Sequence, residues 1–179
     1  MTTRHYTIRD AKAADLDTMV GLLRQLFSIE DDFVFNDIKQ RHGLAALIAD
    51  RERSTIQVAT VRDAVVGMCT AQINISTAEG GLTAHIEDMI VDSQFRGFGI
   101  GTALLEAVSN WAESRGCLRL QLLADKRNEK ALRFYHHAGW TMTHMMCLNK
   151  KFNCSSYSYR IHSAHTHIPA GGTSYAARS

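Results

Sequence analysis

The stretch QFRGFGIGTALLEAV, residues 94–108, places three glycines at alternate positions and then continues into a pattern typical of a helix. Glycines have no Cβ, so such a loop lets a ligand approach the main-chain N–H groups closely. The apolar residues that recur at helical spacing are Ile100, Leu104, Val108 and Trp111. A helix that begins here offers unpaired N–H groups and the positive end of its dipole. We predict an anion site suited to phosphate, against the alternative of a turn that caps a helix without any ligand.

Two common phosphate-binding loops are excluded by the residues around these glycines. A Walker loop ends in Gly-Lys-Ser/Thr, but Gly101 is followed by Thr102 and no lysine. The dinucleotide fingerprint requires Gly or Ala at its sixth position, and counting from Gly97 or Gly99 gives Thr102 or Leu104 there. Neither of these two motifs fits the glycine loop.

The composition is that of an ordinary globular protein. The chain has 179 residues, 45% of them hydrophobic and 21% charged, which favours one domain with a sizeable core. A net charge of +2 indicates no strong attraction to nucleic acid or to a membrane, and no apolar run approaches spanning length. The start, MTTRHYTIRD, lacks the apolar core of a signal peptide, and the four cysteines form no CxxC pair. These features predict a cytoplasmic protein with buried free thiols.

Hydrophobic periodicity predicts a single mixed α/β domain. A strand at residues 5–9 precedes helices at 16–27 and 38–48, and a hairpin at 54–76 turns at Arg62 and Asp63. The remaining predicted elements are a strand at 84–91, the helix from residue 100, a strand at 118–124, a short helix at 128–139 and closing strands at 140–152. Composition then changes, so residues 1–152 are predicted to form the domain and residues 153–179 a tail or arm.

The central motifs resemble those of one enzyme family. DSQFRGFGIGTALL is similar to the acyl-CoA-binding signature Arg/Gln-x-x-Gly-x-Gly/Ala of the GNAT N-acetyltransferases, with Arg96, Gly99 and Gly101 at its fixed positions. The flanking strands and NEKALRFYHHAGW follow that family's order of parts over residues 6–152, most specifically over 85–140. The resemblance implies the acyl-CoA N-acetyltransferase fold, a mostly antiparallel mixed sheet flanked by helices, whose fourth and fifth strands splay apart to admit pantetheine.

The resemblance also implies the cofactor and where it binds. Acetyl-CoA would place its pyrophosphate on the glycine loop and its pantetheine amides along the end of the preceding strand, where N–H groups would also stabilise negative charge on the thioester oxygen. The implied cofactor-binding residues are Met89, Ile90, Val91, Arg96, Gly97, Phe98, Gly99, Ile100, Gly101, Thr102, Asn128, Ala131 and Tyr135. Asn128 is also read as the N-cap of the short helix. Transfer would be direct, because no cysteine occupies a nucleophile position of the motif.

Two residues are predicted to move protons. IEDMIVDSQFRGFGIG is similar to the spermidine/spermine-type diamine acetyltransferases, whose base precedes the motif arginine at the spacing of Glu87 from Arg96. An alkylammonium has a pKa of about 10.4, so such a base is needed, either directly or through water. Tyr135 lies where the diamine enzymes place the acid that protonates the departing thiolate. The alternatives are an ion-paired strand carboxylate for Glu87 and a packing role for Tyr135.

Neighbours of Glu87 carry secondary predictions. Asp88 would point to the opposite face of a regular strand, whereas a bulge, common in this family, would change that assignment. His85 alternates with Glu87 and is a candidate relay or acceptor contact, with a hydrogen-bonded strand histidine as the alternative. The acidic loop SIEDDF adds candidate acceptor-binding carboxylates at Glu30, Asp31 and Asp32, although a solvated loop explains them equally well.

The expected acceptor is a primary amine, either a small cationic amine or a polyamine. Acetylation of a protein lysine or N-terminus is the alternative activity, and a non-catalytic acyl-CoA-binding sensor is the alternative class. The tail histidines His162, His165 and His167 have ligand-like spacing but no accompanying carboxylate, so no metal site is predicted. The expected partners are the small amine alone, without nucleic acid or membrane, and the sequence leaves a homodimer open.

Overall fold

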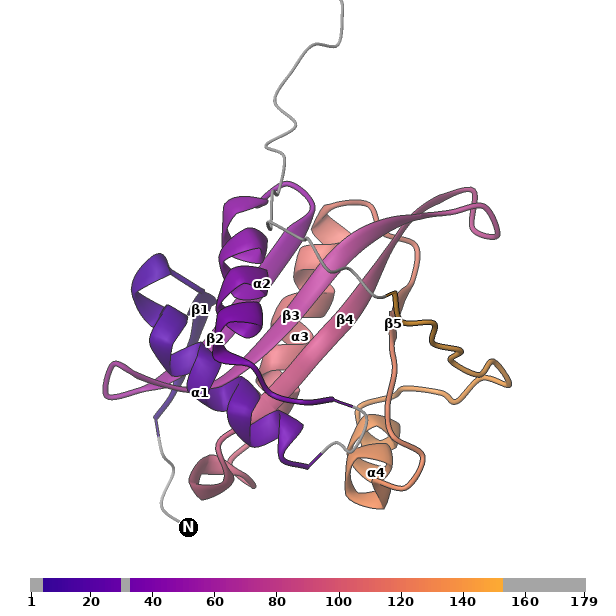
Figure 1. Cartoon of the computed structure of the whole chain (residues 1–179). Helices are drawn as coiled ribbons and strands as arrows, with labels where there is room; N and C mark the ends of the chain where they lie inside the picture. Colours follow the sequence, from indigo (N-terminus) through magenta and orange to yellow (C-terminus); the bar gives the residue numbers. More distant parts are fainter. Residues whose placement is uncertain (1–4, 30–32, 153–179) are drawn as a thin grey trace, which may run out of the picture. The chain divides into compact units, whose positions relative to one another are not determined.

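Helices lie on both faces of a five-stranded sheet in the computed structural model, which describes residues 5–29 and 33–152 (Figure 1). The strands are β1 (Thr7–Asp10), β2 (Ser54–Val61), β3 (Ala64–Ser76), β4 (Gly81–Val91) and β5 (Leu120–Leu122). The helices are α1 (Leu16–Phe27), α2 (Asp37–Ala49), α3 (Ile100–Ser114) and α4 (Glu129–His137), with short 3-10 turns at Ala13–Asp15 and Ser93–Phe95. The described residues up to Cys147 belong to one compact unit, and residues 148–152 to a second.

The sheet is mostly antiparallel, with strand order β1-β2-β3-β4-β5. Only the β4–β5 pair is parallel, and it is short, with Ala84 to Ile86 opposite Leu120 to Leu122. β4 continues five residues beyond this pairing, to Val91, and there pairs with β3 alone. The two strands therefore separate after Ile86, which confirms the predicted mixed sheet with splayed fourth and fifth strands.

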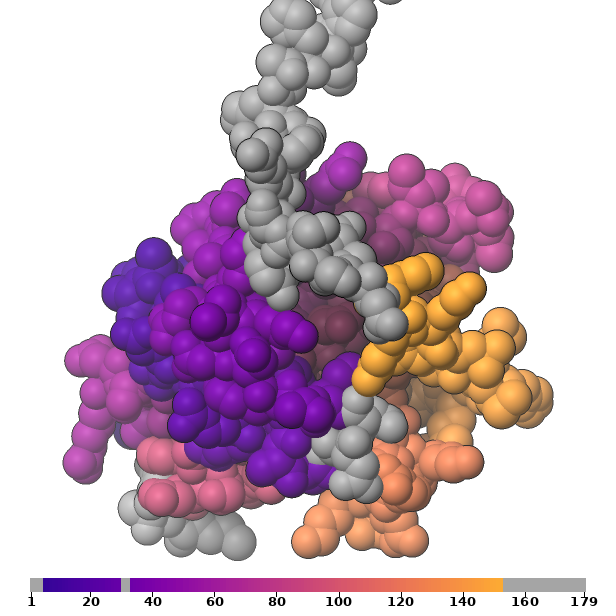
Figure 2. Space-filling model, in the orientation of Figure 1, coloured from indigo at the N-terminus to yellow at the C-terminus, as the bar shows by residue number. Residues whose placement is uncertain are grey.

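Two apolar clusters hold the layers together, one on each face of the sheet. α1 and α2 cover one face, where Met19 and Leu23 pack with Val58 and Met68, and Figure 2 shows the side chains of these helices gathered there. α3 covers the other face, where its predicted stripe of Ile100, Leu104 and Val108 is almost fully buried. Burial of such side chains contributes about 1.5–3 kcal/mol each, so these faces dominate the stability of the fold.

Most predicted elements are confirmed, and the predicted hairpin turn has a clear local cause. Arg62 and Asp63 join β2 to β3 with φ values of 49° and 67°. Two successive left-handed residues make a turn whose twist matches that of the flanking strands. In the part of the chain that the structure describes, no helix is both long enough and apolar enough to cross a membrane.

The closing strands predicted at residues 140–152 are wrong. No residue of this segment is in a strand, and Met142, Met145 and Met146 are 79–86% exposed. Apolar composition suggested strands, but a strand also needs a hydrogen-bonded partner, and this segment has none among the described residues. The strand predicted at 118–124 is likewise shorter, because Leu118 and Leu123 lie outside β5 and are exposed.

The cysteines differ from the prediction in their burial. Cys69 is fully buried, and burial raises the pKa of its thiol well above the usual range. Cys117 is partly buried and Cys147 is exposed, so the expectation of buried thiols fails at Cys147, which lies in the segment that forms no strand. All three are free thiols. Cys154 lies outside the described residues, as does the predicted tail, so a domain boundary after residue 152 stays a prediction.

A half-buried ion pair fixes the start of α1 to β1. Arg9 donates from Nη1 to Asp15 Oδ2 at 2.7 Å and from Nη2 to Asp15 Oδ1 at 2.9 Å. The Lys12 N–H also donates to Asp15 Oδ2 at 2.7 Å. The hydrogen bond from Arg9 holds the pKa of the Asp15 carboxyl below its ordinary value of 3.8, with burial acting in the opposite direction. The ionised carboxylate therefore stabilises the folded state.

Asp15→Asn is expected to lower the free energy of unfolding by about 2 kcal/mol at neutral pH, because it removes charge-assisted hydrogen bonds. A folded-state pKa below the unfolded value means that this contribution is complete above the unfolded pKa and is lost as pH falls through the folded pKa. Urea unfolding from pH 7 to pH 2 should thus show the two proteins converging in acid. Asp17→Asn, at an exposed ion pair with Arg41, is the control and should cost under about 1 kcal/mol; equal losses in both variants would refute the assignment.

Candidate functional site

A β-bulge in β4 lies where β4 and β5 begin to separate. On β3, Ala71 pairs with Ile86 and Cys69 pairs with Met89, so Thr70 faces two residues, Glu87 and Asp88. The Asp88 N–H donates to Thr70 Oγ1 at 3.0 Å. The regular alternation that would place Glu87 and Asp88 on opposite faces is therefore interrupted at these two residues.

Past the bulge, β4 directs polar main-chain groups away from β3. The Asp92 N–H donates to the Val66 carbonyl at 2.9 Å, so residues 92 and 66 form a hydrogen-bonded pair of the antiparallel ladder. Because such pairs alternate, the main-chain groups of Met89 and Val91 point to the opposite side, where β5 has already ended its pairing. The Val91 carbonyl accepts from Arg96 Nε at 2.9 Å. An extended amide chain could pair with the other groups as an added strand.

The carboxylate of Glu87 is accessible at this bulge. Its side chain is 58% exposed, and its Oε2 lies 3.6 Å from Nε2 of His85, whose side chain is 18% exposed. An exposed carboxylate beside a half-buried imidazole can accept a proton from a bound cation and pass it on. The side chain of Ile90, another predicted cofactor-binding residue on β4, is buried in the core on the α1 side of the sheet.

The glycine loop adopts the backbone that its sequence requires. Gly97 and Gly99 have φ values of 81° and 82°, in the left-handed region that other residues rarely enter. Gly99 is the N-cap of α3, and the first helical hydrogen bond runs from the Ala103 N–H to the Gly99 carbonyl at 3.1 Å. The N–H groups of residues 100–102 therefore precede the hydrogen-bond ladder of the helix and are available to an anion.

Gly101 is a packing point between three elements. A Cβ at this position would lie 3.2 Å from Phe134 Cζ of α4 and 3.3 Å from Met89 Cε of β4. The absence of a side chain thus brings the start of α3 close to α4 and to the end of β4. Of the other predicted loop residues, Arg96, Phe98 and Thr102 are exposed, whereas the Ile100 side chain is buried in the core.

Tyr135 extends from α4 to the separation of the strands. Its hydroxyl donates to Met89 Sδ at 3.8 Å, and its ring contacts Phe134 and Trp140 at centroid distances of 5.3 Å and 6.1 Å. Asn128 caps the helix, its Oδ1 accepting from the Ala131 N–H at 3.1 Å. The predicted N-cap is confirmed, and it fixes where α4 begins.

These groups together fit a coenzyme A thioester. The separated end of β4 presents main-chain groups to an amide chain, the start of α3 presents N–H groups to a diphosphate, and both meet at Gly101 and Met89. Glu87 lies two residues before Met89 on β4, and the Tyr135 hydroxyl donates to Met89 Sδ. The acidic residues Glu30, Asp31 and Asp32 lie outside the described residues, so the predicted acceptor loop stays a prediction.

Thr70 was not predicted as a site residue, although it closes the bulge, because it is a single polar residue inside an apolar strand. Met89 was predicted to contact the cofactor, but the contacts of its side chain with Tyr135 and with the Gly101 position were not predicted. The signal for Thr70 was a lone hydroxyl in the run VVGMCTAQ, which has meaning only once its partner strand is known.

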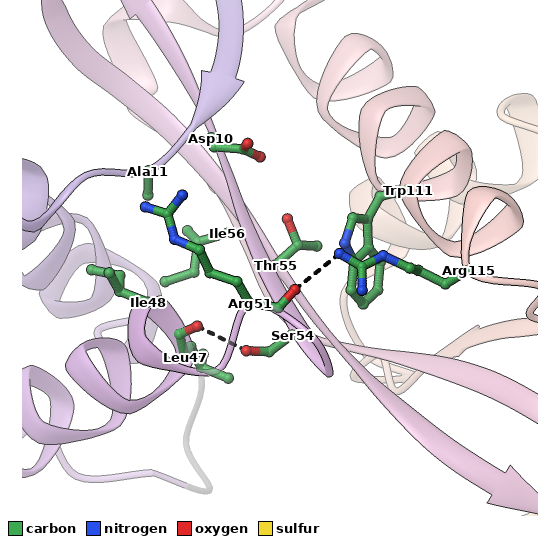
Figure 3. Close-up of a pocket in the computed structure, with 10 residues that line it drawn as sticks. All are labelled: Asp10, Ala11, Leu47, Ile48, Arg51, Ser54, Thr55, Ile56, Trp111 and Arg115. Atoms are coloured by element: carbon green, nitrogen blue, oxygen red, sulfur yellow. Dashed lines mark hydrogen bonds between the residues drawn. The ribbon is translucent and has the colours of Figure 1, made fainter. Parts of the chain in front are cut away.

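A cavity of about 220 Å³ lies elsewhere, at the C-terminal ends of α2 and α3 (Figure 3). Arg115 lies beside Trp111 there and donates to the carbonyls of Glu52 at 2.8 Å and Arg51 at 3.0 Å. Ser54 Oγ donates to the Leu47 carbonyl at 2.8 Å. Because α3 is 15 residues long, this cavity is about 20 Å from the glycine loop, too far to belong to the same site.

Gly99→Ala is expected to lower the free energy of unfolding by about 1–2 kcal/mol, because alanine is strained at φ 82°. Relief of that strain would rotate the loop N–H groups away from the anion, so that they no longer hydrogen-bond it. The affinity for coenzyme A should therefore fall about tenfold. Calorimetric titration and urea unfolding measure both effects. Gly43→Ala, in the middle of α2 with nothing within 4 Å of the new Cβ, is the control and should stabilise slightly. Unchanged coenzyme A affinity in Gly99→Ala would count against the loop as the anion site.

Comparison with known proteins gives relatives of one kind. The chain is 30% identical over 136 residues to an uncharacterized N-acetyltransferase of Methanocaldococcus jannaschii, a match covering 75% of this chain and 60% of that protein. It is 35% identical over 77 residues to the glucosamine 6-phosphate N-acetyltransferase of Trypanosoma brucei brucei, covering 42% and 50% of the two chains. The chain thus matches only half to three-fifths of the length of these two relatives. Others are named as thialysine and aminoglycoside N-acetyltransferases.

The fold is shared with solved structures of the same kind. An aminoglycoside N-acetyltransferase in complex with CoA superposes with a TM-score of 0.72 at 20% identity, covering 84% of this chain and 96% of that one. The profile of the Acetyltransferase (GNAT) family matches residues 20–140, more than half of the chain. The chain therefore belongs to the GNAT acetyltransferase family, whose fold and acetyl-CoA dependence the glycine motif predicted.

Proposed function

We propose that this protein transfers the acetyl group of acetyl-CoA directly to a primary amine. The observation that carries the proposal is the meeting of three elements at Met89: the bulged end of β4, the start of α3 and the hydroxyl of Tyr135 on α4. One element supplies an accessible carboxylate, one supplies N–H groups for an anion, and one supplies a phenol. Direct amine acetylation is accelerated by each of these three kinds of group.

Each group has a defined task in this proposal. Bound acetyl-CoA supplies an activated acetyl thioester. Glu87 accepts the proton of the acceptor ammonium, directly or through water, and leaves a neutral nitrogen. The N–H groups of Met89 and Val91 donate to oxygen as it gains negative charge. The neutral nitrogen then attacks the thioester carbon, and as the C–S bond breaks Tyr135 donates its hydroxyl proton to the departing sulfur. The second proton that the nitrogen loses restores the Tyr135 hydroxyl through solvent, and the proton on Glu87 passes to solvent, so one proton is released for each amine that is acetylated.

The proposed acceptor is a small cationic amine or a polyamine. The exposed Glu87 carboxylate favours a cation, and the sequence adds a second acidic cluster at residues 30–32. The acceptors named for the relatives, glucosamine 6-phosphate, thialysine and aminoglycosides, differ in size but all carry a primary amine. The diamine-type motif around Glu87 supports a polyamine, which none of these relatives is named for. The cytoplasmic location inferred from the sequence stays a prediction.

The experiment is thiol release from acetyl-CoA against a panel of amines: spermidine, diaminopropane, thialysine, glucosamine 6-phosphate, an aminoglycoside and a lysine-containing peptide. Turnover of diamines or polyamines with the highest kcat/KM supports the proposed acceptor. Preference for the peptide would identify a protein acetyltransferase instead. Coenzyme A binding without turnover of any acceptor would favour a sensor.

We also propose a homodimer in which residues 140–147 of one copy add a strand to β5 of the other. β5 is an edge strand with no further partner among the described residues, and Leu118 and Leu123 beside it are exposed. Met145 and Met146, in residues 140–147, are also exposed. A two-fold axis would let this segment of each copy cover the free edge of β5 in the other copy.

Sedimentation equilibrium tests the dimer. Wild type should sediment as a dimer at micromolar concentration, and Met145→Lys should weaken dimerisation at least about tenfold, because a charge would be buried in the new contact. Ile75→Lys, at an equally exposed apolar residue of the β3–β4 hairpin, is the control and should leave the dimer intact. A monomeric wild type, or equal loss in both variants, refutes this arrangement.

A further inference from the structure

Thr70 is a buried polar residue at the middle of the sheet. It lies on β3 between Cys69 and Ala71, and all three residues are 0% exposed. A hydroxyl in such surroundings is costly unless it is hydrogen-bonded. Thr70 Oγ1 accepts from the Asp88 N–H at 3.0 Å and donates to Asp88 Oδ2 at 3.4 Å. Both hydrogen bonds go to one residue of the bulge.

The bulge explains why a hydroxyl is needed here. Glu87 and Asp88 together oppose Thr70, so one N–H of β4 loses its regular carbonyl partner. The Thr70 side chain takes the place of that carbonyl. Serine in place of Thr70 could make the same hydrogen bond, whereas valine has the shape of threonine but no hydroxyl and could not.

The bulge also changes the phase of β4. In a regular strand Ile86 and Ile90 would share a face, but Ile86 packs on the α3 side and Ile90 on the α1 side. The main chain changes phase in the same way. The Ala84 N–H donates towards β5, to the Arg119 carbonyl at 2.8 Å, and regular alternation would next direct residues 88 and 90 to that side. After the bulge, Met89 and Val91 are directed there instead.

We propose that Thr70 is a positioning residue that locks this change of phase. Through the Asp88 N–H it fixes the outward position of the Glu87 carboxylate and directs the Met89 and Val91 N–H groups into the opening beside β5. It touches neither the acceptor nor the thioester. The effect of Thr70 on Glu87 rests on the proposed function. The effect of Thr70 on the Met89 and Val91 N–H groups, and so on cofactor binding, rests on the strand geometry alone.

The test compares Thr70→Val with Thr70→Ser, and uses Thr55→Val as the matched control. Thr55 is a buried threonine whose hydroxyl also accepts a hydrogen bond, from Gln57 Nε2 at 2.9 Å. It lies opposite Ala71 on β2, a strand that pairs with β3 but not with the bulged strand β4. Coenzyme A affinity by calorimetry, kcat for thiol release, and the pH profile of kcat/KM are measured for all three. Urea unfolding reports any general loss of stability.

Thr70→Val is expected to weaken coenzyme A binding and to lower kcat, each by about tenfold, because an unsatisfied N–H would let the bulge relax. The acid limb of its pH profile should also move, since Glu87 would change surroundings. Thr70→Ser should stay within about threefold of wild type, as its hydroxyl keeps the bond. Thr55→Val should lose stability but keep kcat and coenzyme A affinity.

The inference is overturned if Thr70→Val behaves like Thr55→Val, or if Thr70→Ser is as impaired as Thr70→Val. If wild type acetylates no amine, the proposed function fails, but the coenzyme A affinities of the three variants still decide the role of Thr70. Failure of one proposal is thereby distinguished from failure of the other.

Discussion

Glu87→Gln is expected to lower kcat/KM for the amine by about 100-fold or more at neutral pH while coenzyme A affinity stays unchanged. An alkylammonium with a pKa of about 10.4 is only about one part in a thousand neutral at pH 7.4, so removing the proton acceptor removes most of the reactive nitrogen. Glutamine keeps the size of the side chain but cannot take a proton. The loss should shrink as pH approaches the pKa of the amine, because solvent then supplies the neutral form.

The matched control is Glu113→Gln, an exposed carboxylate on α3 near the far end of the helix from the glycine loop. It removes the same charge from the protein and should leave kcat/KM within about twofold, since a surface charge at this distance is screened by salt. If Glu87→Gln retained the wild-type pH profile, Glu87 would be a strand-surface carboxylate, and another group would have to accept the proton.

Tyr135→Phe is expected to lower kcat by about 100-fold with little change in coenzyme A affinity. The phenyl ring keeps its contacts with Phe134 and Trp140, so α4 should keep its place, and only the hydroxyl at Met89 is lost. Without a proton donor the sulfur must depart as the thiolate, which is a poorer leaving group than the thiol. An acetyl thioester of a more acidic thiol should therefore recover part of the rate.

Trp140→Phe separates packing from proton donation. It weakens the same aromatic cluster but leaves the Tyr135 hydroxyl in place. This variant should lose stability and keep most of its kcat. If instead it lost as much kcat as Tyr135→Phe, or if Tyr135→Phe kept full activity, Tyr135 would be a packing residue of α4.

The parts of the fold that depend on local chemistry were predictable from the sequence. The glycine loop is one, because glycine readily adopts the positive φ values that Gly97 and Gly99 have. The amphipathic helices are another, since α1 and α3 bury the stripes that their spacing shows. Asn128 also predicts the start of α4, because its side chain accepts from the Ala131 N–H as an N-cap.

Features set by the pairing of distant strands were not predictable. The sequence raised a bulge in β4 only as a property of the family, because its position depends on which residues of β3 lie opposite. Thr70 is separated from Asp88 by 18 residues and has no local motif. The predicted closing strands failed for the same reason, because apolar residues at 140–152 do not by themselves supply a partner strand.

The most direct test of acetyl transfer at the end of β4 is to measure free thiol and acetylated amine together. Wild type, acetyl-CoA and the best amine of the panel should yield the two products in equal amounts, and both should fall together in Glu87→Gln and in Tyr135→Phe. Thiol without acetylated amine would show hydrolysis rather than transfer. Equal amounts of both products at wild-type rates in the two variants would contradict the assignment of this site.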